Sequence, residues 1–281
     1  MAKILEKVRK VIFLVLGVGL YLNLSLFSDE SLILHLKMDE GKGDILNDSS
    51  GYYNNGKIYG AKWVKDEEIG RYVLAFDGED DFVSLPSSIN GKAVEVWFKT
   101  EAVGGGVLIH NARSWSGCWP NYRYGLTINK KGTLYVIVGG GGKNHITLES
   151  KEVVNTGKWV QAVVTFDDKN IYLYINGKLD SKTSYDFNIV SSQFFTIGAE
   201  YNNYNAYVIK KAEEGVEKYK ELIKKWKERY EKENPGKKFT LSIKGWPVYS
   251  GFYGGLMKTV KVYDKTLSAE DVKKSYEMGI K

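Results

Sequence analysis

Apolar and polar residues alternate with a period of two from about residue 32, in short runs separated by turn residues. This period is typical of strands with one face in a core and the other toward solvent. The runs that predict strands are residues 33–38, 73–77, 82–85, 92–100, 106–110, 124–129, 133–138, 145–149, 158–166, 170–175, 195–198 and 252–264. Many closely spaced strands predict an all-β fold, either a sandwich or a barrel.

Signals at the ends of these runs predict a hairpin and a short helix. Asn176-Gly177 is a two-residue hairpin turn. Ser268 is followed three residues later by Asp271, which is a helix-start pattern. A helix is expected to follow to about Met278 and to end at Gly279.

Residues 206–233 have a different period, because apolar residues recur there at alternating spacings of three and four. This spacing predicts a helix with one apolar stripe, which the turn residues after it end. The stripe consists of Ile209, Ala212, Val216, Tyr219, Ile223, Trp226 and Tyr230. Two interpretations stay open: the stripe lies on the sandwich, or it pairs with another copy of the chain or another protein.

The N-terminal segment is apolar on all sides. Residues 11–27 carry no charge, and a basic stretch precedes them. No small-residue cleavage motif ends the run, so we expect residues 1–28 to be a retained transmembrane signal anchor, with secretion after cleavage as the alternative. The basic flank should stay in the cytoplasm, which places a domain of residues 29–281 outside the cell.

The formal net charge of +6 is unevenly distributed along the chain. Residues 1–10 carry +3 and residues 208–238 carry +4, so the remaining residues carry −1. A nearly neutral body offers no broad basic face, and we expect no nucleic-acid partner. Cys118 is the single cysteine, which excludes a disulfide within one chain.

Several motifs follow one another in the order found in a known family. They are LHLKMDEGKGDILNDSSGYYNNGKIYGA, FDGEDDFVSLP, KAVEVWFKTE, GKWVQAVVTFDDKNIYLYINGKLD and FYGGLMKTVKVYDKTLSAEDV. Over residues 32–200 and 252–280 the chain resembles laminin-G-like domains of the concanavalin A-like lectin/glucanase superfamily. The resemblance implies a two-sheet antiparallel jelly-roll sandwich, here with a helical insertion at about residues 203–246.

The same fold hosts glycoside hydrolases, so catalysis has to be weighed. Those enzymes need an E-x-D-x-x-E strand that places alternate carboxylates on one face. The nearest strand here has Glu95 and Glu101, but Trp97 occupies the place of the middle carboxylate. We therefore expect no enzyme activity and keep a glycoside hydrolase as the less favoured alternative.

Calcium is the cofactor that the resemblance implies, because related sandwiches often hold a structural ion among oxygen ligands. The expected ligands stand in the resembling motifs and are Asp48, Asp77, Asp80 and Asp81. Lys258 stands where the family commonly has an acidic residue, which argues against the ion. The alternative is that these aspartates cap their own turns.

An aromatic loop between two strands is the expected ligand-binding site. It gathers aromatic rings and guanidinium groups from Arg113, Trp115, Trp119, Tyr122, Arg123 and Tyr124. Rings suit the apolar CH faces of sugars, and fork-like donors suit their hydroxyls. The alternative is a small core under long loops.

These observations together predict a membrane-anchored extracellular module that binds a glycan or a protein surface without catalysis. The alternative is a structural envelope protein that forms a homo-oligomer through the helix of residues 206–234.

Overall fold

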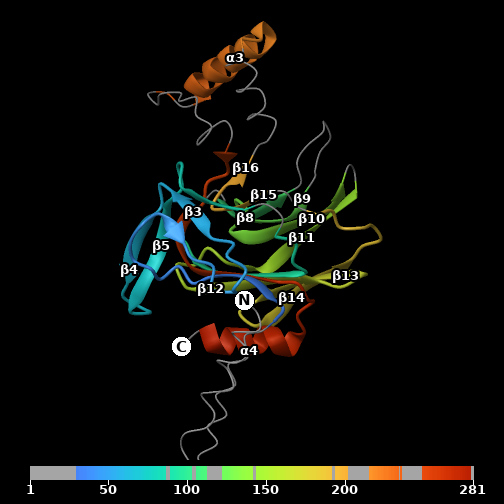
Figure 1. The fold of residues 1–281 in the computed structure, drawn as a ribbon. Helices are drawn as coiled ribbons and strands as arrows, with labels where there is room; N and C mark the ends of the chain where they lie inside the picture. The colour runs from blue at the N-terminus through green and yellow to red at the C-terminus, as the bar shows by residue number, and fades with distance from the viewer. Residues whose placement is uncertain are drawn as a thin grey trace, which may run out of the picture.

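The protein is described here from a computed structural model. The described residues are 30–86, 89–102, 106–112, 122–141, 144–191, 194–201, 215–233, 235 and 249–279. Two antiparallel eight-stranded sheets pack face to face (Figure 1). The all-β, two-sheet sandwich that the alternating pattern and the resemblance predict is therefore confirmed.

The first sheet has the order β14-β13-β12-β7-β18-β5-β4, and β1 also pairs with β18. Its strands are β1 (Leu32–Leu36), β4 (Lys62–Asp66), β5 (Arg71–Asp77), β7 (Ala93–Lys99), β12 (Val160–Phe166), β13 (Asn170–Ile175), β14 (Lys178–Ser184) and β18 (Gly254–Tyr263). β18 comes near the end of the chain, yet it pairs with β1, β5 and β7. The middle of the sheet is thus completed only by the last strand.

The second sheet has the order β11-β10-β9-β8-β15-β6-β3-β2. Its strands are β2 (Ile45–Leu46), β3 (Gly56–Tyr59), β6 (Phe82–Leu85), β8 (Gly106–Ala112), β9 (Tyr122–Ile128), β10 (Thr133–Gly141), β11 (Asn144–Val153) and β15 (Phe194–Ile197). Inward-facing side chains of both sheets, among them Phe98, Leu126 and Val164, form one buried hydrophobic core. Burial of this apolar surface is the main force that holds the sheets together.

The alternating pattern misses β2 and β3 of the second sheet, and it also misses β4 and β14, which are the two edge strands of the first sheet. Both edge strands are largely polar, with the sequences KWVKD and KLDSKTS, and most of their side chains are exposed or partly exposed. Polar edge strands discourage pairing with other chains. The same polarity removes the signal by which a half-buried strand is recognised.

The helix α4 (Ala269–Gly279) covers the outer face of the first sheet (Figure 1). The predicted start is confirmed: the Ser268 hydroxyl accepts the Asp271 N–H at 3.1 Å, and the Asp271 carboxylate accepts the Ser268 N–H at 3.0 Å. A Cβ atom on Gly279 would lie 2.4 Å from the Trp97 ring. Gly279 is the last residue of α4. Because it has no Cβ atom, the end of the helix can approach the sheet closely.

A buried carboxylate lies beneath α4. Glu95 is 0% exposed, and Lys261 stands directly opposite it in the pairing of β7 with β18. Its donors are Ser275 Oγ (2.6 Å), Trp97 Nε1 (3.0 Å), Gln161 Nε2 (3.1 Å), Lys261 Nζ (3.3 Å) and Tyr263 Oη (3.3 Å). Burial favours a raised pKa for Glu95, but Lys261 and the hydrogen bonds hold that pKa below its ordinary value. The carboxylate thus joins three strands of the sheet, β7, β12 and β18, to α4.

A second contact holds the C-terminal end of α4. The Trp97 and Tyr276 rings stack with centroids 5.6 Å apart and planes 2° apart. Lys258 Nζ lies 3.9 Å from the Trp97 ring centroid and donates to the Gly279 carbonyl at 2.7 Å. Burial lowers the pKa of Lys258 to about 8. Lys258, which stands where the family commonly has an acidic residue, therefore holds the C-terminal end of α4 against the sheet.

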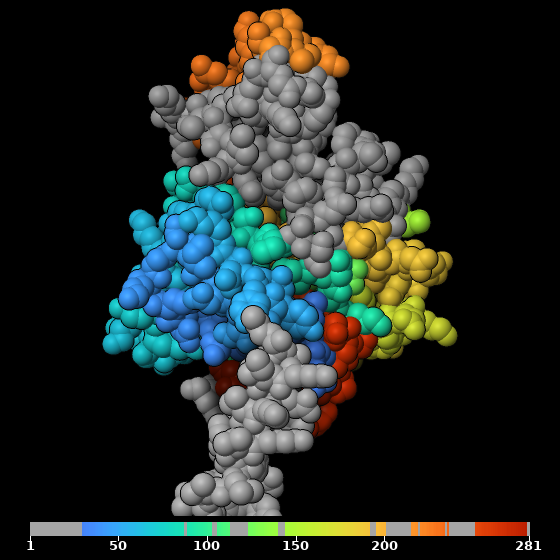
Figure 2. Space-filling view, viewed as in Figure 1, coloured from blue at the N-terminus to red at the C-terminus, as the bar shows by residue number. Residues whose placement is uncertain are grey.

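The inserted helix α3 (Glu217–Glu233) stands at the opposite end of the molecule from α4, orange and red in Figure 2. The prediction of a helix over residues 206–233 is confirmed from Glu217 onward. It is wrong at Gly215, because the φ of +89° at this residue lies outside the right-handed helical region. The helix starts two residues later, at Glu217. Residues 206–214 lie outside the described part of the chain.

The apolar stripe of α3 is partly covered. Ile223, Trp226 and Tyr230 are intermediate in exposure, whereas most other described side chains of the helix are exposed. Ile223 packs against a small cluster that contains Phe82 and Ala199. This contact favours the interpretation in which the stripe lies on the sandwich. Oligomerisation through the helix stays a prediction.

The insertion leaves and rejoins the sandwich at one place. β16 (Glu200–Tyr201) pairs with β17 (Tyr249–Ser250) in a two-stranded antiparallel sheet. The predicted anchor, residues 1–28, lies outside the described residues. Neither helix within the described ranges combines the length and the apolar character that a membrane crossing needs.

We predict that Lys261→Met lowers the free energy of unfolding by about 2–4 kcal/mol at pH 7, because it leaves a buried carboxylate without its cation. Since the folded-state pKa of Glu95 is lowered, its contribution is present above the ordinary carboxyl pKa and is lost as the pH falls. The difference between variant and wild type should therefore shrink in acid. Denaturant titrations at several pH values measure both effects.

Lys273→Met is the matched control, because Lys273 pairs with Glu277 on the exposed side of α4. It should leave the free energy of unfolding nearly unchanged at each pH. An equal decrease in the free energy of unfolding for the two variants would contradict a special role for the Glu95–Lys261 pair.

Candidate functional site

A groove lies at the end of the first sheet where β12 turns into β13. Its wide part has a volume of about 810 Å³ and adjoins a narrower part of about 310 Å³. The walls are the turn of residues 167–169 and the segment of residues 184–190, which follows β14. Asn144, at the start of β11, adds a wall from the second sheet. The groove is therefore shared between the two layers.

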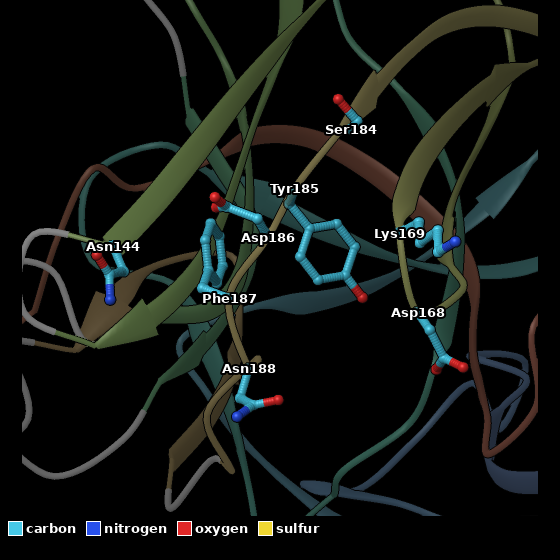
Figure 3. A pocket seen from close by; sticks show the side chains of 8 residues that line it. All are labelled: Asn144, Asp168, Lys169, Ser184, Tyr185, Asp186, Phe187 and Asn188. Atoms are coloured by element: carbon cyan, nitrogen blue, oxygen red, sulfur yellow. The ribbon is translucent and has the colours of Figure 1, made fainter.

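Two aromatic rings form one side of the groove. Tyr185 and Phe187 are partly buried, with ring centroids 5.3 Å apart and planes tilted by 50° (Figure 3). The Tyr185 hydroxyl donates to the Asp167 carbonyl, and its N–H donates to the Lys169 carbonyl at 2.9 Å. These bonds hold the segment of residues 184–190 against the β12–β13 turn, so the Tyr185 ring is fixed before a ligand arrives.

Asp167 stabilises that turn. Its carboxylate accepts the N–H of Lys169 at 2.8 Å, the N–H of Asn170 at 2.7 Å and the Tyr172 hydroxyl at 2.9 Å. The Lys169 N–H is the main reason that the Asp167 pKa is lowered, and the side chain stays ionised at neutral pH. Asp167 therefore has a structural role in shaping the groove.

Four other polar side chains of the groove are not used by the described part of the fold. Asp168, Asp186, Asn144 and Asn188 are exposed, and none of these side chains forms a hydrogen bond or ion pair within the described ranges. Figure 3 shows them around the two rings. Carboxylates and amides that are not used by the fold are available to a ligand rich in hydroxyl groups.

Arg123 lines the narrow part but is used by the fold. Its guanidinium donates to the carbonyls of Gly91 at 2.8 Å, Val190 at 2.9 Å and Asn90 at 3.3 Å. Burial lowers its pKa, although a guanidinium remains charged. The side chain was expected to bind ligand directly, but its donors are committed to backbone, so its role is to fix the wall of the groove.

Tyr124 is a core residue, and the expectation that it contacts ligand is wrong. Its ring is 0% exposed and packs edge-on against Phe195, with centroids 6.4 Å apart. Burial raises its pKa to about 12. Tyr124, Leu126 and Ile128 alternate inward along β9, and this alternation was already visible in the sequence.

The rest of the aromatic loop lies outside the described residues: Arg113, Trp115, Trp119 and the side chain of Tyr122. The chain enters and leaves this loop at Ala112 and Tyr122, whose backbones pair. The next residue, Arg123, lines the groove. The loop therefore starts and ends beside the narrow part, and its role as a ligand site stays a prediction.

Tyr185 and Phe187 were not among the site residues predicted from the sequence. The signal was present in SYDFNI, where aromatic residues alternate with aspartate and asparagine directly after a hairpin. The Asn176-Gly177 hairpin indicated a strand after the turn, but the polar sequence of that strand did not show where it ends, so neither ring was assigned to a site.

Glu95, the carboxylate weighed for glycoside hydrolysis, is sealed under α4 and committed to five donors. Glu101 lies beyond the end of β7 and is exposed. A general acid must come within hydrogen-bond reach of its substrate, and buried Glu95 has no such access.

Three of the four aspartates expected to bind calcium come together. Asp77, Asp80 and Asp81 each offer one oxygen within 4.8 Å of the others. Asp81 Oδ2 accepts the Asp77 N–H at 2.8 Å, and Asp77 Oδ1 accepts the Glu79 N–H at 2.8 Å. Burial, followed by repulsion from Asp77 and Asp80, raises the Asp81 pKa. The remaining oxygens fit a hard cation that completes its shell with water.

Asp48 is not part of that group. Its two oxygens accept the N–H groups of His35, Ser50 and Asn54, each at 2.9 Å, and the Ser50 hydroxyl at 2.8 Å. These bonds hold its pKa low although burial acts to raise it. This aspartate caps its own loop, which was the alternative role.

The described residues thus form a two-sheet antiparallel sandwich with a groove at one end. The family model described as the concanavalin A-like lectin/glucanases superfamily matches residues 77–208, which confirms the resemblance over this part of the chain. A comparison with curated proteins found no match.

Solved structures of similar fold include binding domains of bacterial toxins. The receptor binding domain of botulinum neurotoxin D matches with a TM-score of 0.56 and 17% identity over 90% of this chain and 54% of that chain. The binding domain of Paraclostridial Mosquitocidal Protein 1 matches with a TM-score of 0.57 and 11% identity over 90% and 53%. The binding domain of botulinum neurotoxin DC, solved in complex with SialylT, matches with a TM-score of 0.56 and 13% identity over 90% of this chain and 52% of that chain. This chain spans about half the length of each, and the likeness is one of fold.

We propose that Asp77, Asp80 and Asp81 hold a calcium ion. Calcium that binds only the folded state should then raise the melting temperature of chelator-stripped protein. At a calcium concentration of ten times Kd, the free energy of unfolding should rise by about 1.4 kcal/mol. Asp80→Asn should abolish the increase, whereas Asp264→Asn, at an exposed aspartate outside the group, should keep it. An unchanged melting temperature at millimolar calcium would refute the site.

Proposed function

We propose that the chain is a membrane-anchored extracellular module that binds carbohydrate and does not catalyse a reaction. The observation that carries this proposal is the groove, in which Tyr185 and Phe187 lie beside exposed polar side chains that the fold does not use. Binding sites for small ligands are commonly concave, lined by aromatic rings and supplied with a few polar groups that set orientation.

The chemistry of sugars matches this lining. One face of a pyranose presents C–H groups, which pack on an aromatic ring, and its rim presents hydroxyls that both donate and accept hydrogen bonds. Asp168 and Asp186 can accept from hydroxyls, and the amides of Asn144 and Asn188 can also donate. Because Tyr185 is already fixed by two hydrogen bonds, little conformational entropy is lost when a sugar binds.

The comparisons support a binding role at the level of fold. Several similar structures bear the description receptor binding domain, and one was solved in complex with SialylT. In this proposal Trp115 and Trp119, in the loop that starts and ends beside the narrow part, extend the ligand site along a longer glycan.

We predict that Phe187→Ala weakens binding of the best ligand on a glycan array by about 1–3 kcal/mol, the scale of an aromatic anchor, while the melting temperature changes little. Trp119→Ala should act in the same way. Titration calorimetry on the array ligand, with thermal melts, measures both quantities.

Tyr52→Ala is the control, because Tyr52 is an aromatic residue that is 58% exposed and lies outside the groove. Its binding should equal that of the wild type. Loss of melting temperature without loss of affinity in Phe187→Ala would assign the ring to packing and remove the support for the proposal.

The anchor is the second part of the proposed function. Residues 11–27 are apolar and follow a basic flank, so the groove would be presented outside the cell. Full-length protein should sediment with membranes and need detergent for extraction, and residues 29–281 should remain in the supernatant. Mature native protein that begins near Ser28 would show cleavage instead.

A further inference from the structure

Two neighbouring tyrosines lie on the surface of the turn between β2 and β3. Tyr52 is 58% exposed and Tyr53 is 82% exposed, the largest fraction among the exposed large hydrophobic side chains of the described residues. Neither hydroxyl forms a hydrogen bond within the described ranges. A single exposed ring is common on a protein surface, but these two adjacent rings form a small apolar patch that the core does not use. We call the two residues the tyrosine pair.

The turn that carries the tyrosine pair is held in one shape by hydrogen bonds. Asp48 accepts the N–H groups of Ser50 and Asn54, each at 2.9 Å, and the Asn55 side chain accepts the Asp48 N–H at 2.8 Å. Tyr53 has a φ of +61°, a region that a residue with a bulky side chain rarely adopts. Such a backbone persists only where the surrounding structure imposes it. The rings are therefore presented in a fixed position before any partner arrives.

The same turn is bonded to the residues that follow the proposed membrane anchor. The Asn54 side chain donates to the Ile33 carbonyl at 3.0 Å, at the start of β1. Ile33 comes six residues after Phe27, at which the apolar run ends. Even a fully extended chain of this length reaches only about 20 Å. With residues 11–27 in the bilayer, as the proposed function has them, the tyrosine pair stays within reach of the membrane surface.

The turn carries no charge that would oppose contact with lipid. Residues 49–56 have the sequence SSGYYNNG, without an acidic or basic side chain. Moving a charged group towards hydrocarbon costs free energy, whereas a tyrosine ring can place its apolar body below the headgroups and keep its hydroxyl in water. Tyrosine is enriched at membrane–water interfaces for this reason.

We propose that the tyrosine pair docks the folded domain on the phospholipid bilayer that holds the anchor, with both rings in the headgroup region. This inference rests on the anchor of the proposed function and adds a second contact with the same membrane. Because the anchor keeps the turn at the surface, even an intrinsically weak contact is populated. Docking limits the orientations of the domain and so fixes the direction in which the groove opens.

The first test measures how fast each tyrosine couples to a polar diazonium reagent that does not enter bilayers. Full-length protein is placed in phosphatidylcholine nanodiscs, and a protease site inserted after Asp29 allows the same sample to be measured before and after release of the domain. Release should raise the coupling rates of Tyr52 and Tyr53 roughly three- to tenfold, because lipid no longer covers the rings. Protein without the insertion should match the uncut sample.

Tyr135 is the matched control for this reaction. It is a partly exposed tyrosine on β10, near one edge of the second sheet, whereas the turn joins β2 and β3 at the opposite edge. Its coupling rate should be the same before and after release. A parallel rise at Tyr135 would show that the nanodisc hinders the reagent in general, and it would contradict docking through the tyrosine pair.

A double variant, Tyr52→Ser with Tyr53→Asn, tests whether the rings restrict the motion of the anchored domain. Asparagine tolerates a positive φ better than tyrosine, so the melting temperature should not fall. A fluorophore is attached to Lys178→Cys, at an exposed position on β14, in a Cys118→Ser background. Its residual anisotropy in nanodiscs should be lower in the double variant than in protein that keeps both rings.

The control for the double variant removes two exposed apolar side chains outside the turn. Val153→Ser with Met278→Ser serves this purpose, because these side chains are 53% and 67% exposed. It should leave the residual anisotropy unchanged. An equal decrease in both double variants would assign the effect to surface polarity in general and overturn the role of the tyrosine pair.

The outcomes separate the inference from the function on which it rests. Equal coupling of the tyrosine pair before and after release, in protein that sediments with membranes, overturns docking while the anchor stands. Slow coupling that persists after release would show that a second copy of the chain covers the rings, and it also overturns docking on lipid. If the native chain is cleaved near Ser28, the proposed anchor fails, and the inference fails with it.

Discussion

The fold depends on β18 hydrogen-bonding in the middle of the first sheet. This strand comes after the whole second sheet and the insertion, yet β1, β5 and β7 all pair with it. Its Lys261 also neutralises the buried Glu95 across the β7 pairing. Without β18 the sheet would separate into β14-β13-β12-β7 and β5-β4, β1 would lose its pairing strand, and the buried carboxylate would lose its cation. The last strand therefore completes both the hydrogen bonding and the electrostatics.

This constraint limits where the insertion can stand in the chain. The insertion must leave after β15 and return before β18, and the β16–β17 pair brings its two ends together. The groove forms at the opposite edge of the first sheet from β4, where β12, β13 and β14 are joined by turns and the chain crosses to the second sheet. The turn and the crossing segment carry Asp168, Asp186 and Asn188, whose side chains the described part of the fold does not use.

The alternating pattern predicted most of the strands, although not β3 inside the second sheet, and the sequence predicted α4 because Ser268 and Asp271 form a capping pair. β4 and β14 are polar edge strands that lack this alternation, and β14 was indicated only by the Asn176-Gly177 hairpin that precedes it. Arg123 and Tyr124 were assigned to a ligand from composition alone, whereas strand register turns Tyr124 into the core and backbone carbonyls occupy Arg123. Tyr185 and Phe187 line the groove only because their segment packs against the turn of residues 167–169, which lies elsewhere in the sequence.

The proposed ligand site lies against residues 184–190. Amide hydrogen exchange tests this placement most directly. With and without a saturating oligosaccharide, the account predicts slower exchange in residues 167–169 and 184–190 and unchanged exchange in the β4–β5 turn. Protection that leaves both groove segments unchanged and appears elsewhere on the sandwich would contradict it.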